Sequence, residues 1–532
     1  MEQFLEDRWR LSNTNIKLIL DRGLALILLD GLDEVAGEAG KQITREIKRF
    51  ARCYPQIRII VTCRTQSQES KFDRFDYVEV ADFNEQQVKA FATHWFGTVC
   101  TDIEEEKTKV KEFLSQLFLE ENKPIRELAI TPILLSLTCA VFQQTGKFYS
   151  KRSKLYEEGL ELLLESWDKS REVERDEIYR DLSVERKLEL LGYLAVTKFE
   201  QKQYILFEQA ELEGYIGEFL GIERRESRNV LKAIEYQHGL LIERARGVWS
   251  FSHLTFQEYL VAKWFVDNSH LQNLVDFITT KSYREVFLLV IGIVNHAEEL
   301  LQQMKRKIDT LIASDKKLLR FLDWNTQKLS LVDINYKPSS IRAFYFKTNH
   351  CSGLNLGIDL AFAIDTKLKN DSSSGNFQEL NADINIQFPS PPNSELYVDE
   401  LLDANISQIF DFYPNTLVAR SFLGGINSKD EEFNAAFKEV SSKLPARDNW
   451  DKDGMLWVEQ LQSLSIEYRM IGKNWQFSEN QKELLIQYYD ANKLLVDCLN
   501  SGCIVNDEVR KEIEETLLLP IAEIEKRKQS NS

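Results

Sequence analysis

The first hundred residues alternate short apolar runs with segments of helical periodicity. Residues 25–29 (ALILL) form an uninterrupted apolar run, which is typical of a strand buried on both faces. Residues 58–62 (RIIVT) repeat the pattern, and residues 77–80 are a weaker third candidate. Between the first two runs, residues 41–54 carry apolar positions at helical spacing. Two strands joined by a helix through short connections predict a parallel α/β layer.

Helical periodicity dominates the rest of the chain. Residues 82–85 (DFNE) predict a capped helix start, and Pro132 stands at the first-turn position that proline favours. Residues 157–167 are strongly amphipathic. After further helices, residues 238–244 and 247–251 predict a small β-hairpin, which closes a helical unit in the manner of a winged helix.

The sequence therefore predicts a multidomain, mainly α protein with a partial parallel sheet near its start. Its length exceeds what one hydrophobic core accommodates. Turn-rich residues at 371–376 and 388–393 indicate a boundary. The predicted domains are residues 1–100 (α/β layer), 101–175 (helical domain), 176–268 (winged helix), 269–376 (helical and mixed), 377–394 (linker) and 395–532 (carboxy-terminal helices).

Composition narrows the classes of partner. A formal charge of −17 disfavours non-specific electrostatic binding to nucleic acid or to anionic membranes. We therefore expect neither as a partner. The longest apolar segment, residues 286–294, is about half of a membrane span. Seven scattered cysteines without a secretory signal favour reduced thiols and a cytoplasmic location.

Three carboxylates follow the first apolar run: Asp30, Asp33 and Glu34. In open α/β sheets, ligands bind at the carboxyl edge of the strands, where these acids are expected. Mg²⁺ prefers hard oxygen ligands while keeping waters and nucleotide phosphates, so Asp30 is suited to the metal. A second acid can orient or deprotonate an attacking water. A polar strand-to-helix turn without chemistry is the alternative.

The segment that carries these acids resembles the Walker B element of the NACHT branch of signal-transduction ATPases, the STAND class. In that element an aspartate precedes a small residue, and two further acids follow after one apolar position; Asp30, Gly31, Asp33 and Glu34 match without a gap. The resemblance implies a P-loop-NTPase type of sheet. It assigns Asp30 to Mg²⁺, and Asp33 and Glu34 to hydrolysis or water positioning.

Three further segments extend the resemblance. Arg64, in residues 61–64 (VTCR), matches the family's sensor 1, which implies a catalytic role near the γ-phosphate. Pro132, in residues 126–135, matches a proline that packs on adenine, although a plain helix-start proline is the alternative. His253, in residues 251–259 (FSHLTFQEY), matches a histidine that contacts the β-phosphate of ADP, although a lone histidine beside aromatics is often a core residue.

Residues 466–475 and 488–496 resemble the carboxy-terminal helical region of cyanobacterial NACHT proteins. The resemblance thus covers nearly the whole chain and is most specific before residue 265.

One family element is missing from these 532 residues. A P-loop requires G-x-x-x-x-G-K-[ST], and each Gly-Lys pair here is followed by another residue type: Gln42, Phe148 and Asn474. We expect the P-loop and an amino-terminal effector region to lie upstream, through a gene split, a frameshift or a wrong start.

The resulting hypothesis is a portion of a NACHT-type switch for signalling, as in defence or stress responses, controlled by Mg²⁺ with ATP or ADP. It would be inactive as an isolated chain. Its partners would be further copies of itself or the segment with the P-loop. A non-enzymatic helical sensor or scaffold that binds no nucleotide is the alternative. A DNA-binding winged helix is disfavoured by the acidic composition and by the lack of a basic recognition helix.

Overall fold

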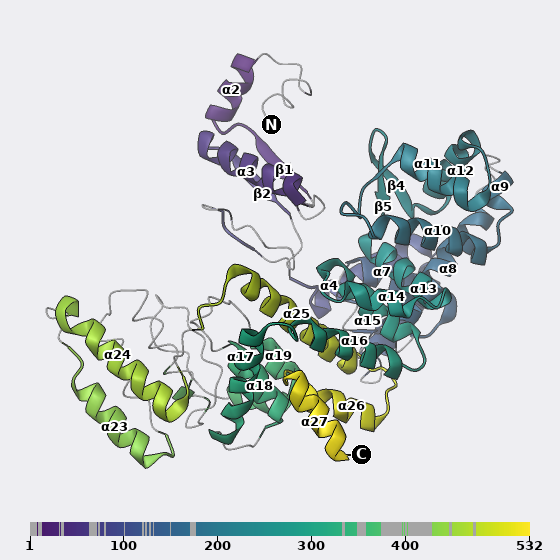
Figure 1. Cartoon of the computed structure of the whole chain (residues 1–532). Helices are drawn as coiled ribbons and strands as arrows, with labels where there is room; N and C mark the ends of the chain where they lie inside the picture. Colours follow the sequence, from purple (N-terminus) through teal and green to yellow (C-terminus); the bar gives the residue numbers. More distant parts are fainter. Residues whose placement is uncertain are drawn as a thin grey trace. The chain divides into compact units, whose positions relative to one another are not determined.

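The computed structural model describes residues 8, 13–30, 32, 37–62, 72, 75–78, 81–100, 102–119, 122, 125–126, 129–130, 132–148, 151–170, 177–331, 336–347, 358–373, 396, 398–399, 402, 428–445, 450–471 and 475–531. The chain divides into two compact units, Met1–Ser269 and His270–Ser532, which are described one after the other. Helices dominate both units, and short strands occur in the first (Figure 1). The predicted mainly α fold with a small parallel sheet and a winged helix is confirmed.

The first unit begins with the predicted α/β layer. Its elements are α2 (Asn13–Asp21), β1 (Leu26–Leu29), α3 (Gly37–Cys53) and β2 (Arg58–Val61). Strands β1 and β2 pair in parallel, with Leu26 opposite Arg58 and Leu29 opposite Val61. Helix α3 connects the two strands and lies along them (Figure 1). The predicted strand–helix–strand order is therefore confirmed.

One face of this strand pair carries a small apolar core. Ile27 of β1 and Ile59 of β2 pack against a cluster of buried residues from the helices and the loop before β2. That cluster consists of Ile16, Leu20, Phe50, Tyr54 and Ile57. Because side chains alternate along a strand, only every second residue of β1 and β2 faces this core.

The opposite face of the strand pair is open to solvent. Leu26 is 55% exposed, Leu28 is 66% exposed and Ile60 is 53% exposed. The sequence predicted burial on both faces, and this prediction is wrong for the chain as it stands. Burial on both faces requires a second layer of structure, and no described residue supplies one on this side.

The third predicted strand does not form in the described part of the chain. Tyr77 and Val78 are exposed and belong to neither described sheet, and residues 79–80 lie outside the described residues. A strand needs a neighbour for its backbone hydrogen bonds, and the described sheet contains only β1 and β2.

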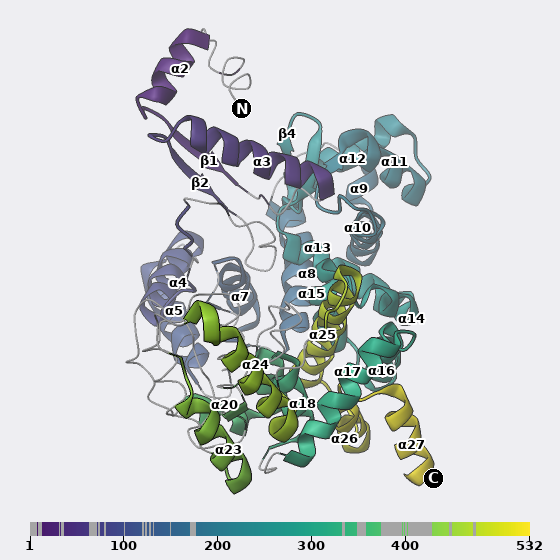
Figure 2. The same ribbon diagram turned by 60° about the vertical axis from the view of Figure 1, so that its left-hand side comes forward.

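Three helices then form a domain with an aromatic core. They are α4 (Glu85–Val99), α5 (Ile103–Leu117) and α7 (Pro132–Thr145), which lie side by side in Figure 2. The predicted capped start of α4 is confirmed, because Asn84 and Gln87 form a reciprocal capping box. Phe113 joins the helices through edge contacts to Phe96 and Phe142, with ring centroids 5.4 and 5.2 Å apart.

The winged helix follows. Its elements are α8 (Arg152–Ser170), α9 (Glu177–Arg180), α10 (Val184–Phe199), β3 (Phe207–Glu208), α11 (Gln209–Leu220), α12 (Arg224–His238), β4 (Leu241–Ala245), β5 (Val248–Phe251) and α13 (Leu254–Asp267). The strands form an antiparallel sheet in the order β3-β5-β4. Trp249 of β5 is buried, so the predicted hairpin closes the core of this domain.

The second unit is helical. Its α-helices are α14 (Leu271–Leu274), α15 (Arg284–Ile293), α16 (Glu298–Leu311), α17 (Lys316–Gln327), α18 (Pro338–Lys347), α19 (Asp359–Ile364), α20 (Thr366–Ser373), α23 (Glu431–Ser442), α24 (Trp450–Arg469), α25 (Glu479–Asn500), α26 (Asp507–Thr516) and α27 (Ile521–Asn531). Short 3₁₀ helices occur at Val275–Phe277, Lys281–Tyr283 and Lys328–Leu331. Helix α20 extends into residues that the sequence assigned to a turn-rich boundary, and the predicted linker 377–394 lies outside the described residues.

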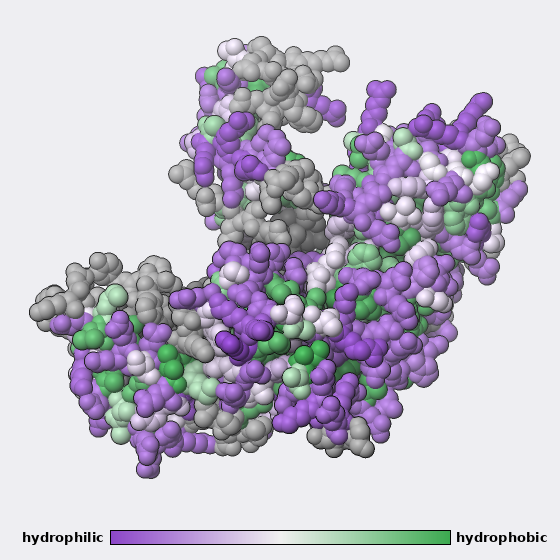
Figure 3. All heavy atoms as spheres, viewed as in Figure 1, coloured by the Kyte–Doolittle hydropathy of each residue, from purple (hydrophilic) through white to green (hydrophobic). Residues whose placement is uncertain are grey.

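The surface visible in Figure 3 is mostly hydrophilic, with hydrophobic side chains in small scattered groups. In the part of the chain that the structure describes, every helix is too short or too polar to cross a bilayer.

Candidate functional site

Asp30 stands at the carboxyl end of β1, where the sequence placed it. Its side chain is exposed and accepts a hydrogen bond from the hydroxyl of Thr62, the residue after β2. The backbone continues the pairing here: Thr62 N–H donates to the carbonyl of Leu29 (2.9 Å), and Leu32 N–H donates to the carbonyl of Thr62 (3.0 Å). The ends of the two strands are thus fastened together, and both side chains lie at the edge where α/β sheets bind ligands.

The three predicted catalytic residues, Asp33, Glu34 and Arg64, lie outside the described residues. Their roles stay predictions. The described backbone bears on them indirectly, since Leu32 directly precedes Asp33 and Thr62 is two residues before Arg64. Leu32 and Thr62 are joined by a backbone hydrogen bond, and nothing further is described of the two segments that follow them.

Asp30 and Thr62 fit a magnesium ion that is shared with a nucleotide. Both offer hard oxygen atoms at an exposed sheet edge. Among the described residues, no group of three His, Cys, Asp or Glu side chains lies close enough to bind a metal. Mg²⁺ needs few protein ligands when waters and phosphates complete its coordination, so one carboxylate with a neighbouring hydroxyl is compatible with it.

Pro132 begins helix α7 and is exposed. The predicted helix start is confirmed. The carbonyl of Pro132 accepts a hydrogen bond from the hydroxyl of Ser136 (3.0 Å), an interaction internal to the first turn. The predicted adenine contact of this proline stays a prediction.

His253 precedes helix α13 as its N-cap residue. Its backbone is extended (φ −137°, ψ 138°), and its side chain makes no capping hydrogen bond. The imidazole packs edge-on against Phe256, with ring centroids 6.2 Å apart, while part of it stays exposed. Burial, followed by the positive charge of Arg244, lowers the pKa of His253, so the ring is neutral at pH 7.

The described contacts do not join all the predicted residues. Asp30 meets Thr62, whereas the interactions described for Pro132 and His253 are with Ser136 and with Phe256 and Arg244. Sequence reasoning missed Thr62 and Arg244. Thr62 could have been found, because it follows the second strand and therefore shares the sheet edge with Asp30. Arg244 carries no such sequence signal.

Helix α12 of the winged helix carries three arginines in its first five residues. Arg224, Arg225 and Arg228 are all exposed. Two of them bind the fully buried carboxylate of Glu213, at 2.7 Å for Arg224 and 2.6 Å for Arg228. The paired arginines hold the pKa of Glu213 at about 2 in spite of its burial. Part of the positive charge of α12 is therefore already compensated inside the domain.

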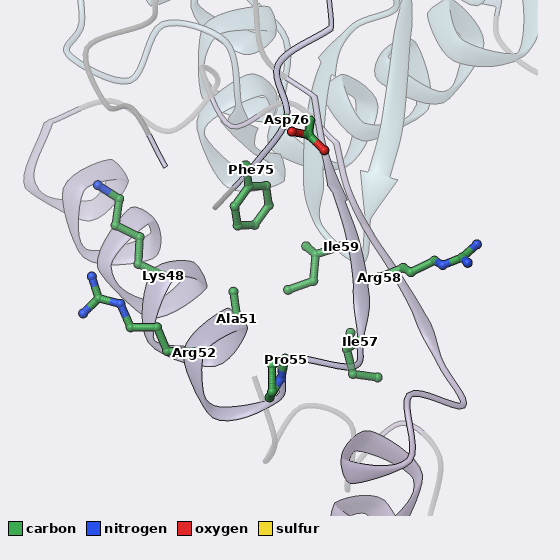
Figure 4. A pocket seen from close by; sticks show the side chains of 9 residues that line it. All are labelled: Lys48, Ala51, Arg52, Pro55, Ile57, Arg58, Ile59, Phe75 and Asp76. Atoms are coloured by element: carbon green, nitrogen blue, oxygen red, sulfur yellow. The ribbon is translucent and has the colours of Figure 1, made fainter. Parts of the chain in front are cut away.

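A pocket of about 420 Å³ lies between α3, β2 and residues 75–76 (Figure 4). Its lining residues are Lys48, Ala51, Arg52, Pro55, Ile57, Arg58, Ile59, Phe75 and Asp76. In Figure 4 Ile59 points toward α3, whereas Arg58 points away from it. The pocket adjoins the start of β2, the opposite end from Thr62, so it is distinct from the edge that carries Asp30.

Comparison with known proteins adds three findings. Residues 152–265 match the winged helix-turn-helix domain C-terminal to NACHT, and residues 429–520 match the NACHT C-terminal helical domain 2. The chain is 21% identical over 373 residues to mouse (Mus musculus) NACHT, LRR and PYD domains-containing protein 3. The aligned part is 62% of this chain and 34% of the mouse protein, so the chain spans about a third of that relative's length.

Proposed function

Because this chain belongs to the NACHT family, we propose that it forms the switch portion of a NACHT-type signalling NTPase controlled by ADP and ATP. The observation that carries the proposal is the exposed carboxylate of Asp30, held by Thr62 at the carboxyl edge of two parallel strands. An anionic oxygen at this edge can bind the Mg²⁺ of a bound nucleotide.

In this proposal each site residue has a separate task. Asp30 binds the metal, and Thr62 orients its carboxylate. Asp33 and Glu34 position or deprotonate the attacking water, and Arg64 neutralises charge on the terminal phosphate. When bound, Mg²⁺ supplies charge neutralisation between the phosphates.

The phosphate cradle comes from a further segment of the protein. The sequence of 532 residues contains no match to the P-loop motif. Two observations support a missing neighbour: Leu28 and Ile60 are exposed on the open face of the strand pair, and neither β1 nor β2 has a second described partner strand. A segment that adds a strand and a helix would cover this face and pair with a free edge.

The winged helix provides the switch. His253 would contact the β-phosphate of ADP and keep the winged helix docked on the NTPase core. Exchange for ATP would favour an undocked state that assembles with further copies, a population shift set by the difference in nucleotide affinity between the two states.

The described cysteines support a reducing compartment. Cys53, Cys100, Cys139, Cys498 and Cys503 are all free thiols. Reduced thiols are typical of the cytoplasm, and we propose that compartment for the protein.

Calorimetry with Mg·ADP tests the proposal in two forms of the protein. The chain alone should bind with a Kd weaker than about 1 mM, because it lacks the cradle. Together with the P-loop segment encoded directly upstream in the genome, it should bind at least ~100-fold more tightly. ATP should then drive assembly, which light scattering detects.

Two outcomes would overturn the proposal. The first is unchanged assembly after Asp30→Ala. The second is an absence of Mg·ADP binding in the longer protein, which would favour the non-enzymatic helical scaffold. A variant of the longer protein that carries Arg246→Gln in the wing is the control for non-specific effects, because Arg246 is exposed and far in sequence from Asp30.

A further inference from the structure

Arg244 of β4 crosses the hairpin of the winged helix and ends beside the residues that lead into α13. Its Nε donates to the hydroxyl of Ser250 at 2.9 Å. Its Nη2 donates to the carbonyl of Ser252 at 2.9 Å and to that of Phe251 at 3.5 Å. One guanidinium therefore binds three consecutive residues of the segment that ends at His253.

These contacts fix the backbone on the amino-terminal side of His253. Ser250 is buried, and its hydroxyl in turn donates to the carbonyl of Phe251 (2.8 Å). The backbone of Ser252 is held from the other side as well, since its N–H donates to the carbonyl of Leu240 (2.8 Å). The chain thus enters His253 from a segment that is hydrogen-bonded on two sides.

The carboxy-terminal side of His253 is fixed by helix α13. The carbonyl of His253 accepts the N–H of Phe256 (3.1 Å), and Phe256 also packs against the imidazole. Phe256 is buried, so the ring rests on a stable support. The imidazole is consequently held between two fixed segments while its outer part faces solvent.

We propose that Arg244 is a positioning residue for His253: it locks the end of β5 so that the exposed imidazole is presented as a hydrogen-bond donor to an oxygen of a bound diphosphate. This inference rests on the proposed function, in which His253 meets the β-phosphate of ADP.

The charge has a second consequence for the imidazole. Burial lowers the pKa of His253, and the cation of Arg244 lowers it further. Arg244 is the charged side chain that lowers the pKa of the ring, and Phe256, which packs against the ring, is uncharged. His253 is therefore neutral near pH 7 and offers one N–H.

Two substitutions separate the charge of Arg244 from its geometry. Arg244→Gln removes the charge, whereas Arg244→Lys keeps the charge but loses the forked contact to the carbonyls. Histidine-selective NMR of the full chain follows the imidazole signals during a pH titration, and His253→Gln identifies the signal among the six histidines.

The expected pattern is specific. Arg244→Gln raises the pKa of His253 toward its ordinary value, Arg244→Lys leaves it lowered, and the exposed wing residue Arg246, changed to Gln, has no effect. Both Arg244 variants speed amide exchange of residues 250–253, because both lose the anchor. An unshifted His253 titration in Arg244→Gln overturns the inference whether or not the nucleotide proposal holds.

A double-mutant cycle of Arg244 and His253, measured as Mg·ADP affinity, tests whether Arg244 acts through the imidazole. In the longer protein with a P-loop segment, Arg244→Gln should weaken Mg·ADP binding about tenfold, and Arg244→Lys should weaken it by a similar factor. Neither should weaken it further once His253 is changed to Gln, because Arg244 acts through that ring. Additive losses would show that Arg244 contacts the nucleotide by itself and would overturn the positioning role.

Failure of the longer protein to bind Mg·ADP would refute the proposed function, while the NMR result would still test the positioning of His253.

Discussion

Lys328 and Asp399 form an ion pair, with 2.6 Å between Nζ and Oδ2, in which neither side chain is exposed to solvent. Asp399 also accepts hydrogen bonds from Arg469 Nε (2.7 Å) and from the hydroxyl of Tyr345 (2.5 Å). One carboxylate therefore neutralises two buried cations from segments far before and far after it in the chain. Buried charges are tolerated only when they are paired, so this carboxylate fastens α24 to the region around α18.

We expect Asp399→Asn to destabilise the second unit by about 3–5 kcal/mol, because it leaves two buried cations without a counter-charge. Urea unfolding, with hydrogen exchange of peptides from 428–471 as a local probe, measures the loss. Glu439→Gln is the matched control: Glu439 pairs with Lys443 on the surface, where solvent screens the pair, so its loss should leave the urea midpoint almost unchanged. Equal effects of the two substitutions would contradict the anchoring role of Asp399.

The acid sensitivity of the winged helix should depend on Glu213. The folded state lowers the pKa of Glu213 from its ordinary 4.5 to about 2, so its contribution to stability is complete above pH 4.5. That contribution is lost as the pH falls from 4.5 toward 2, because the carboxylate becomes protonated in both states. Glu213→Gln should therefore loosen α11 and α12 at pH 7, by about 1–2 kcal/mol, and have a much smaller effect near pH 2.

Hydrogen exchange of peptides from α11 and α12 at a series of pH values tests this dependence. Glu189→Gln is a suitable control, since its carboxylate pairs with Arg186 on the surface of α10. A gap between wild type and Glu213→Gln that stays constant down to pH 2 would refute the assignment.

Gly159 in α8 allows a close approach of α7. A Cβ at this position would lie 2.3 Å from Cδ1 and 2.7 Å from Cγ of Leu137. Gly159→Ala should therefore destabilise by about 1–3 kcal/mol through overpacking, and Leu137→Ala should relieve the clash in the double variant. Thermal unfolding of the four proteins in this cycle measures the coupling.

At Gly214 in α11 we expect a substitution by alanine to stabilise the protein, in contrast to Gly159. Nothing lies within 4 Å of a Cβ built there, and the residue is exposed. Gly214→Ala should stabilise the protein by up to about 1 kcal/mol, because alanine favours helix. If both glycine variants lowered the melting temperature, the contact between α7 and α8 would not be the cause.

We expect Asp30→Asn to reduce ATP hydrolysis without changing the stability of the fold. The side chain is exposed, and its described partner is the Thr62 hydroxyl, so unfolding should change by less than about 0.5 kcal/mol. In the longer protein with a P-loop segment, ATP hydrolysis should fall on the order of 100-fold or more. Thr62→Val should have a smaller effect on hydrolysis, since it removes the orienting hydroxyl and leaves the carboxylate. Hydrolysis that survives Asp30→Asn would remove this carboxylate from the site.

The sequence by itself determined the local elements. The apolar runs before Asp30 and Arg64 became paired strands, the polar segment ending at Asn84 capped α4, and Pro132 began α7. These signals act over a few residues: a cap satisfies free N–H groups, and a proline suits a first turn. The hairpin that closes the winged helix was likewise predicted from the alternation of apolar and polar residues.

Only the tertiary structure decided which charges meet. Asp399 binds Lys328 and Arg469, Arg244 fixes the segment before His253, and Glu213 holds two arginines of the next helix. The solvent exposure of one face of β1 and β2 could not be predicted from the sequence either. An apolar strand pattern indicates that a face should be buried, but it does not say which segment packs against that face. Local order follows from backbone sterics and hydrogen bonds within a few residues, whereas charge pairing and burial depend on where distant segments pack.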